Sequence, residues 1–219
     1  MLKKIKVLLV DDHPLVREGL AVLIRQQADL EICGEAENEP QALALIGTVQ
    51  PDVAIVDITL ENGSGLELVK SIKAIYPAVT VLVLSMHDEE LYAERALRAG
   101  ARGYLMKREA AKKVITGIRS VLAGQLFVSE NIAALMAEKF VEGRVATAAA
   151  PLEQLSNREL EVLQLLGRGY GTRQIADHLH IGFKTVQAYS ARIKEKLKLA
   201  NATELLREAL RLNENSPQK

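Results

Sequence analysis

The sequence predicts an α/β domain built on a five-stranded, doubly wound parallel sheet, followed by a smaller all-α domain. The first part is predicted by short apolar runs, rich in β-branched residues, that alternate five times with helical patterns. The second part is predicted because, after the first 151 residues, every periodic segment is helical and the turns between segments contain glycine. We therefore expect one domain over residues 1–124, a helix and linker over 125–151, and a helix-turn-helix domain over 152–215.

The individual elements follow from apolar spacing. The run Val53 to Val56 is continuously apolar, which is typical of a strand buried on both faces. The segment 14–26 places Leu15, Val16, Leu20 and Leu23 about one helical turn apart, which predicts an amphipathic helix. Strands are expected near residues 4–10, 30–35, 52–57, 79–84 and 103–106, and helices near 14–27, 38–49, 65–76, 88–99, 109–123, 129–140, 157–167, 172–179, 183–197 and 202–212.

Composition narrows the class of protein. The 28 basic and 28 acidic residues cancel, but residues 1–151 hold 17 basic and 20 acidic side chains, which leaves 11 and 8 for residues 152–219. The second part is therefore the one suited to binding a polyanion.

Cys33 is the single cysteine, which excludes an internal disulfide and suits a reducing compartment. No run approaches the roughly 20 apolar residues that a membrane helix needs, and the basic start lacks a signal-peptide core. We expect a cytoplasmic protein that does not contact a membrane.

Polar side chains stand where four of the expected strands end. The first strand is followed by Asp11 and Asp12, the third ends on Asp57, and the fourth and fifth are followed by Ser85 and Lys107. Each of these alone would be read as a helix cap or a turn residue, but carboxyl ends of parallel strands gather at one edge of a sheet. Three carboxylates together suit Mg²⁺ (or Mn²⁺), and a lysine and a hydroxyl could bind a transferred phosphoryl group. The sequence thus predicts a phospho-aspartate site.

These residues carry a family resemblance. The opening Leu8-Leu9-Val10-Asp11-Asp12-His13-Pro14-Leu15-Val16-Arg17 resembles that of receiver domains of bacterial two-component response regulators, in the NarL/FixJ subfamily. The resemblance implies a flavodoxin-like fold, a phosphorylated aspartate at Asp57, and a metal bound by Asp12 directly, by Asp11 through water and by the Thr59 carbonyl. It also implies a switch hydroxyl on Ser85, a switch aromatic at Tyr104 and a phosphate-binding Lys107. Glu61 departs from the family, which usually has proline there, so the metal affinity and the phosphate lifetime are both in question.

The expected helix 183–198 is basic, which by itself would fit either a solvated amphipathic helix or a DNA-binding one. The stretch 152–208 resembles the LuxR-type DNA-binding domain through Leu155-Ser156-Asn157-Arg158-Glu159-Leu160-Glu161-Val162-Leu163, Ile175-Ala176, Lys184-Thr185-Val186 and Lys196-Leu197. The resemblance implies that this helix enters the major groove. Base-facing positions would be Gln187, Ala188 and Ala191; phosphate contacts would come from Lys184, Thr185, Arg192 and Lys194, with Tyr189 where histidine is frequent.

Two further expectations concern this domain. Gly182 replaces the usual Ser or Thr cap, which should cost stability at the start of the recognition helix. The last helix carries Leu205, Leu206 and Leu210, which would serve partly as core and partly as a dimer face.

The combined hypothesis is a DNA-binding response regulator. A cognate sensor histidine kinase would phosphorylate Asp57, and the change would promote homodimer formation and binding to double-stranded operator DNA. The chain's own chemistry would be limited to Mg²⁺-dependent self-phosphotransfer and autodephosphorylation. One alternative is an aspartyl-phosphate phosphatase of the haloacid-dehalogenase kind, which wants an aspartate where this chain has Thr59. The other is a constitutive DNA-binding protein with a degenerate receiver, which Glu61 keeps open.

Overall fold

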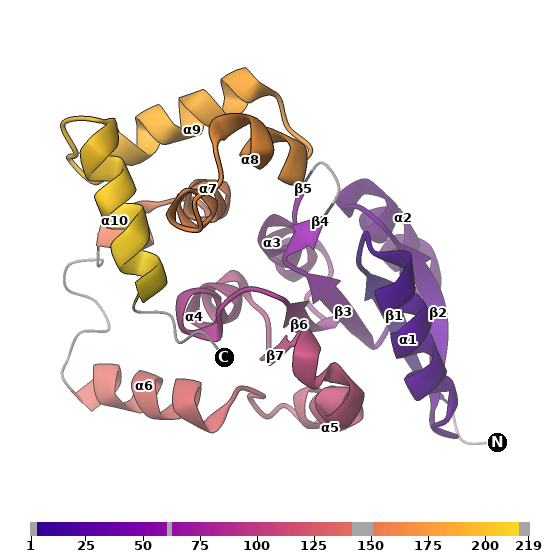
Figure 1. Cartoon of the computed structure of the whole chain (residues 1–219). Coiled ribbons are helices and arrows are strands. Elements are labelled where there is room, and N and C mark those ends of the chain that lie inside the picture. Colours follow the sequence, from indigo (N-terminus) through magenta and orange to yellow (C-terminus); the bar gives the residue numbers. More distant parts are fainter. Residues whose placement is uncertain (1–3, 61–62, 142–150, 215–219) are drawn as a thin grey trace. The chain divides into compact units, whose positions relative to one another are not determined.

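The computed structural model describes residues 4–60, 63–141 and 151–214. Its internal contacts divide the chain into two compact units, residues 1–139 and residues 140–219. Each unit is described separately below (Figure 1).

The first unit is built on a five-stranded parallel sheet with the strand order β2-β1-β3-β6-β7. The strands are β1 (Ile5–Val10), β2 (Leu30–Ala36), β3 (Val53–Asp57), β6 (Thr80–Ser85) and β7 (Gly103–Met106). Chain order reverses between β1 and β3, because β2 lies on one side of β1 and the later strands lie on the other. In doubly wound sheets such a reversal opens a binding position at the carboxyl ends of the two strands. The predicted fold class is therefore confirmed.

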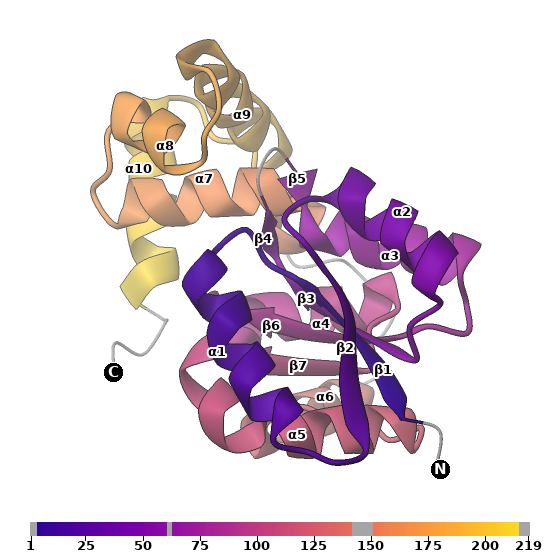
Figure 2. The ribbon, with the colours of Figure 1, turned by 90° about the vertical axis from the view of Figure 1, so that its right-hand side faces the viewer.

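Helices cover both faces of this sheet (Figure 2). They are α1 (Pro14–Arg25), α2 (Glu39–Val49), α3 (Gly65–Ile75), α4 (Glu89–Ala99) and α5 (Ala110–Leu122), with a 3-10 turn, η1, over Lys107–Glu109. Helices α1 and α5 contact each other on one face, and α2, α3 and α4 contact one another in turn on the other. Alternate strand residues such as Val7, Leu9, Val53 and Ile55 form the core beneath α1 and α5. This two-sided burial explains why the central strands β3 and β6 are almost continuously apolar, whereas the edge strand β2 carries Glu31 and Glu35.

A short antiparallel hairpin follows β3 and was not predicted. It pairs β4 (Thr59–Leu60) with β5 (Gly63–Ser64), and Gly65 at the start of α3 donates its N–H to the Ile58 carbonyl at 2.7 Å. A Cβ at Gly65 would stand 1.7 Å from the Asp57 carbonyl oxygen, so only glycine lets α3 begin this close to the end of β3. Glu61, the departure from the family pattern, lies outside the described residues.

Helix α6 (Glu130–Val141) is bonded to α4. The Ser129 hydroxyl accepts the Ile132 N–H, as expected of a cap, and also donates to Glu89. Asn131 Nδ2 donates to Glu90 at 3.1 Å, and Lys139 Nζ donates to Glu94. These contacts explain why the first unit extends to residue 139.

The second unit is helical. It contains a 3-10 turn, η2 (Pro151–Gln154), and the helices α7 (Asn157–Gly167), α8 (Thr172–His178), α9 (Phe183–Lys196) and α10 (Ala202–Glu214). The core includes Leu160, Ile175, Val186, Ile193 and Ala209, contributed by all four helices. Helix α7 packs closely on α10, because Gly167 leaves room for the Ala209 carbonyl. Among the described residues, no helix is both long enough and apolar enough to cross a membrane.

Candidate functional site

The register of the sheet places four predicted side chains together. Val10 pairs with Val56 and Asp57 pairs with Leu84, so Asp11 follows β1 beside Asp57 at the end of β3. Lys107 follows β7 and reaches both carboxylates: its Nζ lies 2.6 Å from Asp57 Oδ2 and 2.6 Å from Asp11 Oδ2. All three side chains are almost fully buried, at 4% exposed or less for the aspartates and 7% for the lysine. Asp12 lies beside them and is partly buried.

Burial sets the electrostatics of this group. Loss of solvation raises the pKa of Asp57 to about 7; Lys107 opposes this rise and the neighbouring Asp11 adds to it. Burial lowers the pKa of Lys107, but the two carboxylates outweigh that effect and hold the pKa above its usual value. Lys107 is therefore a fixed positive charge, whereas Asp57 takes up a proton near neutral pH.

The acidic cluster, defined here as Asp11, Asp12 and Asp57, has the chemistry of a divalent-cation site. One ligand atom from each of its members and one from His13 lie within 4.8 Å of one another. Two buried oxygens, Asp11 Oδ2 and Asp12 Oδ1, accept no hydrogen bond of good geometry from the described residues; Lys107 Nζ lies 2.6 Å from the first and His13 Nδ1 lies 2.6 Å from the second. Hard carboxylate oxygens at this spacing are compatible with Mg²⁺.

Ser85 and Tyr104, the predicted switch residues, are both buried and both form hydrogen bonds with the main chain of His87. Ser85 Oγ accepts the His87 N–H at 2.9 Å, and the Tyr104 hydroxyl donates to the His87 carbonyl at 2.9 Å. Burial raises the pKa of Tyr104 far above its usual range, so its hydroxyl remains a donor. The Nε2 atom of the His87 ring lies 2.8 Å from the Thr59 hydroxyl oxygen, and the ring packs on that of Tyr92.

His87 therefore joins the loop after Asp57 to the hydroxyls of Ser85 and Tyr104. Sequence reasoning did not identify it as a site residue. Apart from its place two residues after Ser85, no sequence signal indicated this role. Two of the hydrogen bonds of His87 use its main-chain N–H and carbonyl, which any residue type could provide.

Arg17 was also missed as a site residue. It is buried in α1, where it donates to the Asp11 carbonyl and, at 2.6 Å, to Glu37. A sequence signal did exist: Arg17 lies on the same helical face as the buried Leu20, Ala21 and Ile24. An arginine on a core-facing position indicates a buried partner, and here that partner is the end of β1.

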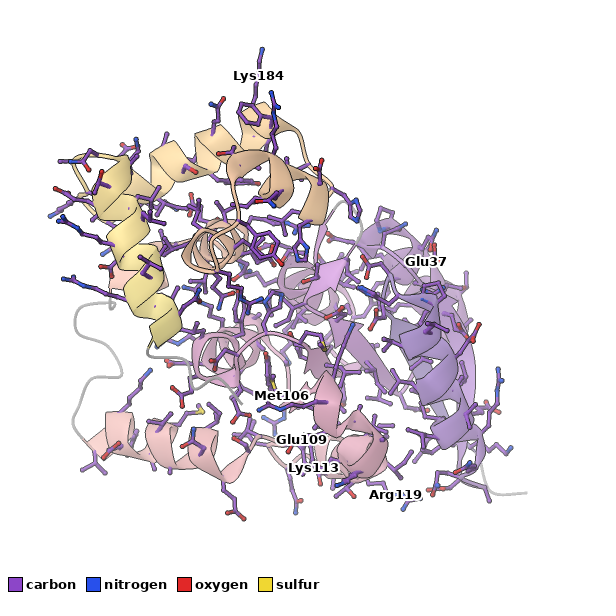
Figure 3. All side chains as sticks on the ribbon, viewed as in Figure 1. Glu37, Met106, Glu109, Lys113, Arg119 and Lys184 are labelled. Atoms are coloured by element: carbon purple, nitrogen blue, oxygen red, sulfur yellow. The ribbon has the colours of Figure 1, made fainter. Side chains whose placement is uncertain are left out.

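In the second unit, the predicted DNA-contact residues lie on α9. Lys184, Thr185, Gln187, Ala188, Ala191 and Arg192 are exposed, and Tyr189 and Lys194 are partly exposed. Lys184 projects outward from the first turn of the helix (Figure 3). Gly182 is the N-cap and provides no side-chain cap, as expected. On α10, Leu205 is buried, whereas Leu206 and Leu210 are each 45% exposed.

An ion pair between the buried Glu159 and the partly exposed Lys196 holds α9 against α7. Ser156 and Glu159 form a capping box at the start of α7, and Lys196 Nζ donates to the same Glu159 carboxylate at 2.6 Å. Burial raises the pKa of Glu159, but the hydrogen bonds from Lys196 and Ser156 outweigh it and keep the pKa below its usual value. The pair therefore stabilises the folded unit at neutral pH.

Lys196→Met should lower the free energy of unfolding by about 1–2 kcal/mol, between the values for exposed and buried pairs, because Lys196 is 38% exposed. The loss should be present at pH 7. It should fade as pH falls through the pKa of folded Glu159, which is depressed by the pair. Urea unfolding followed by helical circular dichroism measures this. Lys184→Met, an exposed lysine of the same helix, is the control, and an equal loss in both variants would contradict the role of the pair.

Comparisons with known proteins agree with this geometry. The chain matches the response regulator receiver domain family over residues 7–119, and the family described as bacterial regulatory proteins, luxR family, over residues 153–209. A receiver joined to a LuxR-type helix-turn-helix unit defines a two-component response regulator that acts in transcription. The chain belongs to this family of response regulators.

Relatives of similar length share this organisation. Oxygen regulatory protein NreC of Staphylococcus epidermidis is 33% identical over 211 residues, covering 94% of this chain and 97% of that protein. NreC of Staphylococcus carnosus is 34% identical over 210 residues, with the same coverage.

Solved structures show the same fold. A LuxR-family response regulator from Aurantimonas is 33% identical, with a TM-score of 0.59 over 64% of this chain and 99% of that one. RcsB of Salmonella enterica serovar Typhimurium, solved bound to a promoter with the phosphomimetic BeF₃⁻, is 26% identical. Its TM-score is 0.59 over 95% of this chain and 98% of that one.

Proposed function

We propose that Asp57 accepts a phosphoryl group and that this modification controls DNA binding by the second unit. The observation that carries the proposal is the buried group of Asp11, Asp57 and Lys107, in which one ammonium contacts both carboxylates at 2.6 Å. Such a group can accept the negative charge of a phosphoryl group without reorganising. The proposed division is a receiver over 1–124, a helix and linker over 125–151 and a DNA-binding domain over 152–215.

The proposed reaction transfers the phosphoryl group from a phosphohistidine of a sensor kinase. A bond forms between a carboxylate oxygen of Asp57 and phosphorus as the histidine nitrogen–phosphorus bond breaks. Asp12, Asp57, the Thr59 carbonyl and, through water, Asp11 would hold Mg²⁺, which supplies charge neutralisation for two anionic reactants. Lys107 balances the charge on the phosphoryl oxygens, and the protein's own later chemistry is hydrolysis of the acyl phosphate.

The contacts of His87 support a switch that follows phosphorylation. In the structure, Ser85 Oγ accepts a hydrogen bond from the His87 N–H. If Ser85 rotates so that its hydroxyl donates to a phosphoryl oxygen, this hydrogen bond from His87 is lost. Tyr104, bonded to the carbonyl of the same residue, is released or shifted with it. Two discrete hydrogen-bond arrangements of this loop would bias the α4 face of the receiver.

In the second unit, α9 would enter the major groove. Lys184, Thr185, Tyr189, Arg192 and Lys194 would contact phosphates, and Gln187, Ala188 and Ala191 would face bases. The exposed Leu206 and Leu210 of α10 offer an apolar face to a second copy, so we propose that a phosphorylated homodimer binds two operator half-sites. We propose that the protein is located in the cytoplasm.

A separate proposal concerns Glu61, which stands where the family usually has proline: we propose that it alters the lifetime of the phosphoryl group on Asp57.

Incubation of the full chain with acetyl phosphate and Mg²⁺, followed by intact mass measurement, tests the proposal. We expect a gain of one phosphoryl group in the parent and none in Asp57→Ala. The same samples should show tighter promoter binding in a gel shift when phosphorylated, and Arg192→Ala should weaken binding and reduce the salt dependence by about one counterion. No mass gain would favour a constitutive DNA-binding protein. Sustained turnover of small phosphate esters would favour a phosphatase.

A further inference from the structure

His13 forms the outer side of the acidic cluster. It is the N-cap residue of α1, yet its side chain caps nothing in the helix. Its N–H instead donates to Asp11 Oδ1 at 2.9 Å, which turns the residue back toward the cluster. Its ring nitrogen Nδ1 lies 2.6 Å from Asp12 Oδ1 and 3.1 Å from Asp11 Oδ1. An imidazole nitrogen therefore stands among the carboxylates proposed to hold Mg²⁺.

Imidazole changes which metals such a cluster favours. Mg²⁺ binds oxygen ligands and keeps several waters, so His13 adds little to its binding. Zn²⁺ and other late transition metals bind imidazole well, and Zn²⁺ is commonly complete with four protein ligands. Asp11, Asp12, His13 and Asp57 offer four ligand atoms within 4.8 Å of one another.

The rest of the geometry permits this ligand set. Lys107 contacts Oδ2 of Asp11, whereas His13 faces Oδ1 of the same carboxylate, so the lysine and a metal need not compete for one oxygen. Tetrahedral zinc ligands stand about 3.4 Å apart, so Nδ1 must retreat from Asp12 by about 0.8 Å from its present 2.6 Å. The His13 side chain is 61% exposed and has room to do so.

We propose that His13, together with the acidic cluster, forms a mixed nitrogen–oxygen site that binds Zn²⁺ in competition with Mg²⁺. Four protein ligands leave no position for a phosphoryl oxygen on a tetrahedral ion, so bound Zn²⁺ prevents modification of Asp57. The second half of this proposal rests on the proposed phosphoryl transfer, whereas the first half concerns metal binding alone.

Calorimetric titration of the full chain with ZnCl₂ and, separately, MgCl₂ tests the first half. The variants are His13→Asn, which keeps a polar side chain at the position, and His180→Asn, which removes an exposed histidine elsewhere. We expect His13→Asn to weaken Zn²⁺ binding at least tenfold and to change Mg²⁺ binding by less than twofold, with His180→Asn like the parent for both ions. Retained Mg²⁺ binding also shows that the variant is folded around the cluster.

Absence of Zn²⁺ binding in the parent, or equal Zn²⁺ binding in the parent and His13→Asn, would overturn the proposal. An equal loss of Mg²⁺ and Zn²⁺ binding in His13→Asn would overturn it too, since it would make His13 a structural support rather than a ligand. The second half is tested by acetyl phosphate modification with Mg²⁺ and equimolar Zn²⁺: the parent should be blocked and His13→Asn modified. Failure of the parent to be modified with Mg²⁺ alone would instead refute the proposed function, and the titration would still decide the metal site.

Discussion

Asp57→Asn should be more stable than the parent at pH 8 in the absence of metal, and its stability should change less between pH 5 and pH 8. The pKa of folded Asp57 is about 7, against 3.8 for an ordinary exposed aspartate, so between these values the folded state holds a proton that the unfolded state has lost. The parent's stability therefore falls as pH rises through this window and levels off above it. Charging the buried carboxyl should therefore cost the parent on the order of a few kcal/mol of stability at pH 8.

Urea midpoints at pH 5 and pH 8, with a chelator present, measure this effect. Glu18→Gln, which removes an exposed carboxylate from α1 of the same unit, is the matched control and should follow the parent. The idea fails if Asp57→Asn loses as much stability as the parent across this range.

Lys107→Met should lower the free energy of unfolding by about 3 kcal/mol or more at pH 8, because it leaves Asp11 and Asp57 buried without a counter-charge. The loss should be smaller at pH 6, where Asp57 takes up a proton more readily. Modification by acetyl phosphate should also slow markedly, since the same ammonium would face the phosphoryl oxygens.

Two comparisons isolate the cause of this loss. Lys113→Met removes a half-exposed lysine paired with Glu109 and should cost less than about 1 kcal/mol. The double variant Lys107→Met/Asp57→Asn should recover part of the stability, because one of the two buried charges is then absent. A double variant no more stable than Lys107→Met would show that lost packing, and not charge, explains the effect.

Most of the first unit could be predicted from the sequence because its strands are buried on both faces. Short apolar runs alternating with helical patterns located the five strands, and the polar residues at the ends of four of them predicted the group around Asp57. Register then determines that Lys107 meets Asp57, since Ser85 pairs with Met106. The hairpin of β4 and β5 was not predicted because two-residue strands leave no periodic pattern.

Other details depended on contacts that the sequence does not display. Leu15 was placed on the apolar face of the first helix but is 82% exposed, and Arg17 takes a buried position instead. Hydrophobicity alone could not show this, because the arginine is stabilised by the Asp11 carbonyl and by Glu37. His87 escaped notice for a similar reason: its importance comes from the conformation of one loop.

The hydrogen bonds between α6 and α4 suggest a route by which a conformational change at Ser85 would reach the end of the first unit. His87 packs its ring against Tyr92 of α4, with ring centres 4.6 Å apart, and α4 is tied to α6 through Glu89, Glu90 and Glu94. Lys139, at the far end of this series of bonds, is the last residue of the first unit. A displacement of α4 would therefore also move α6 and, with it, Lys139, the residue at which the first unit ends.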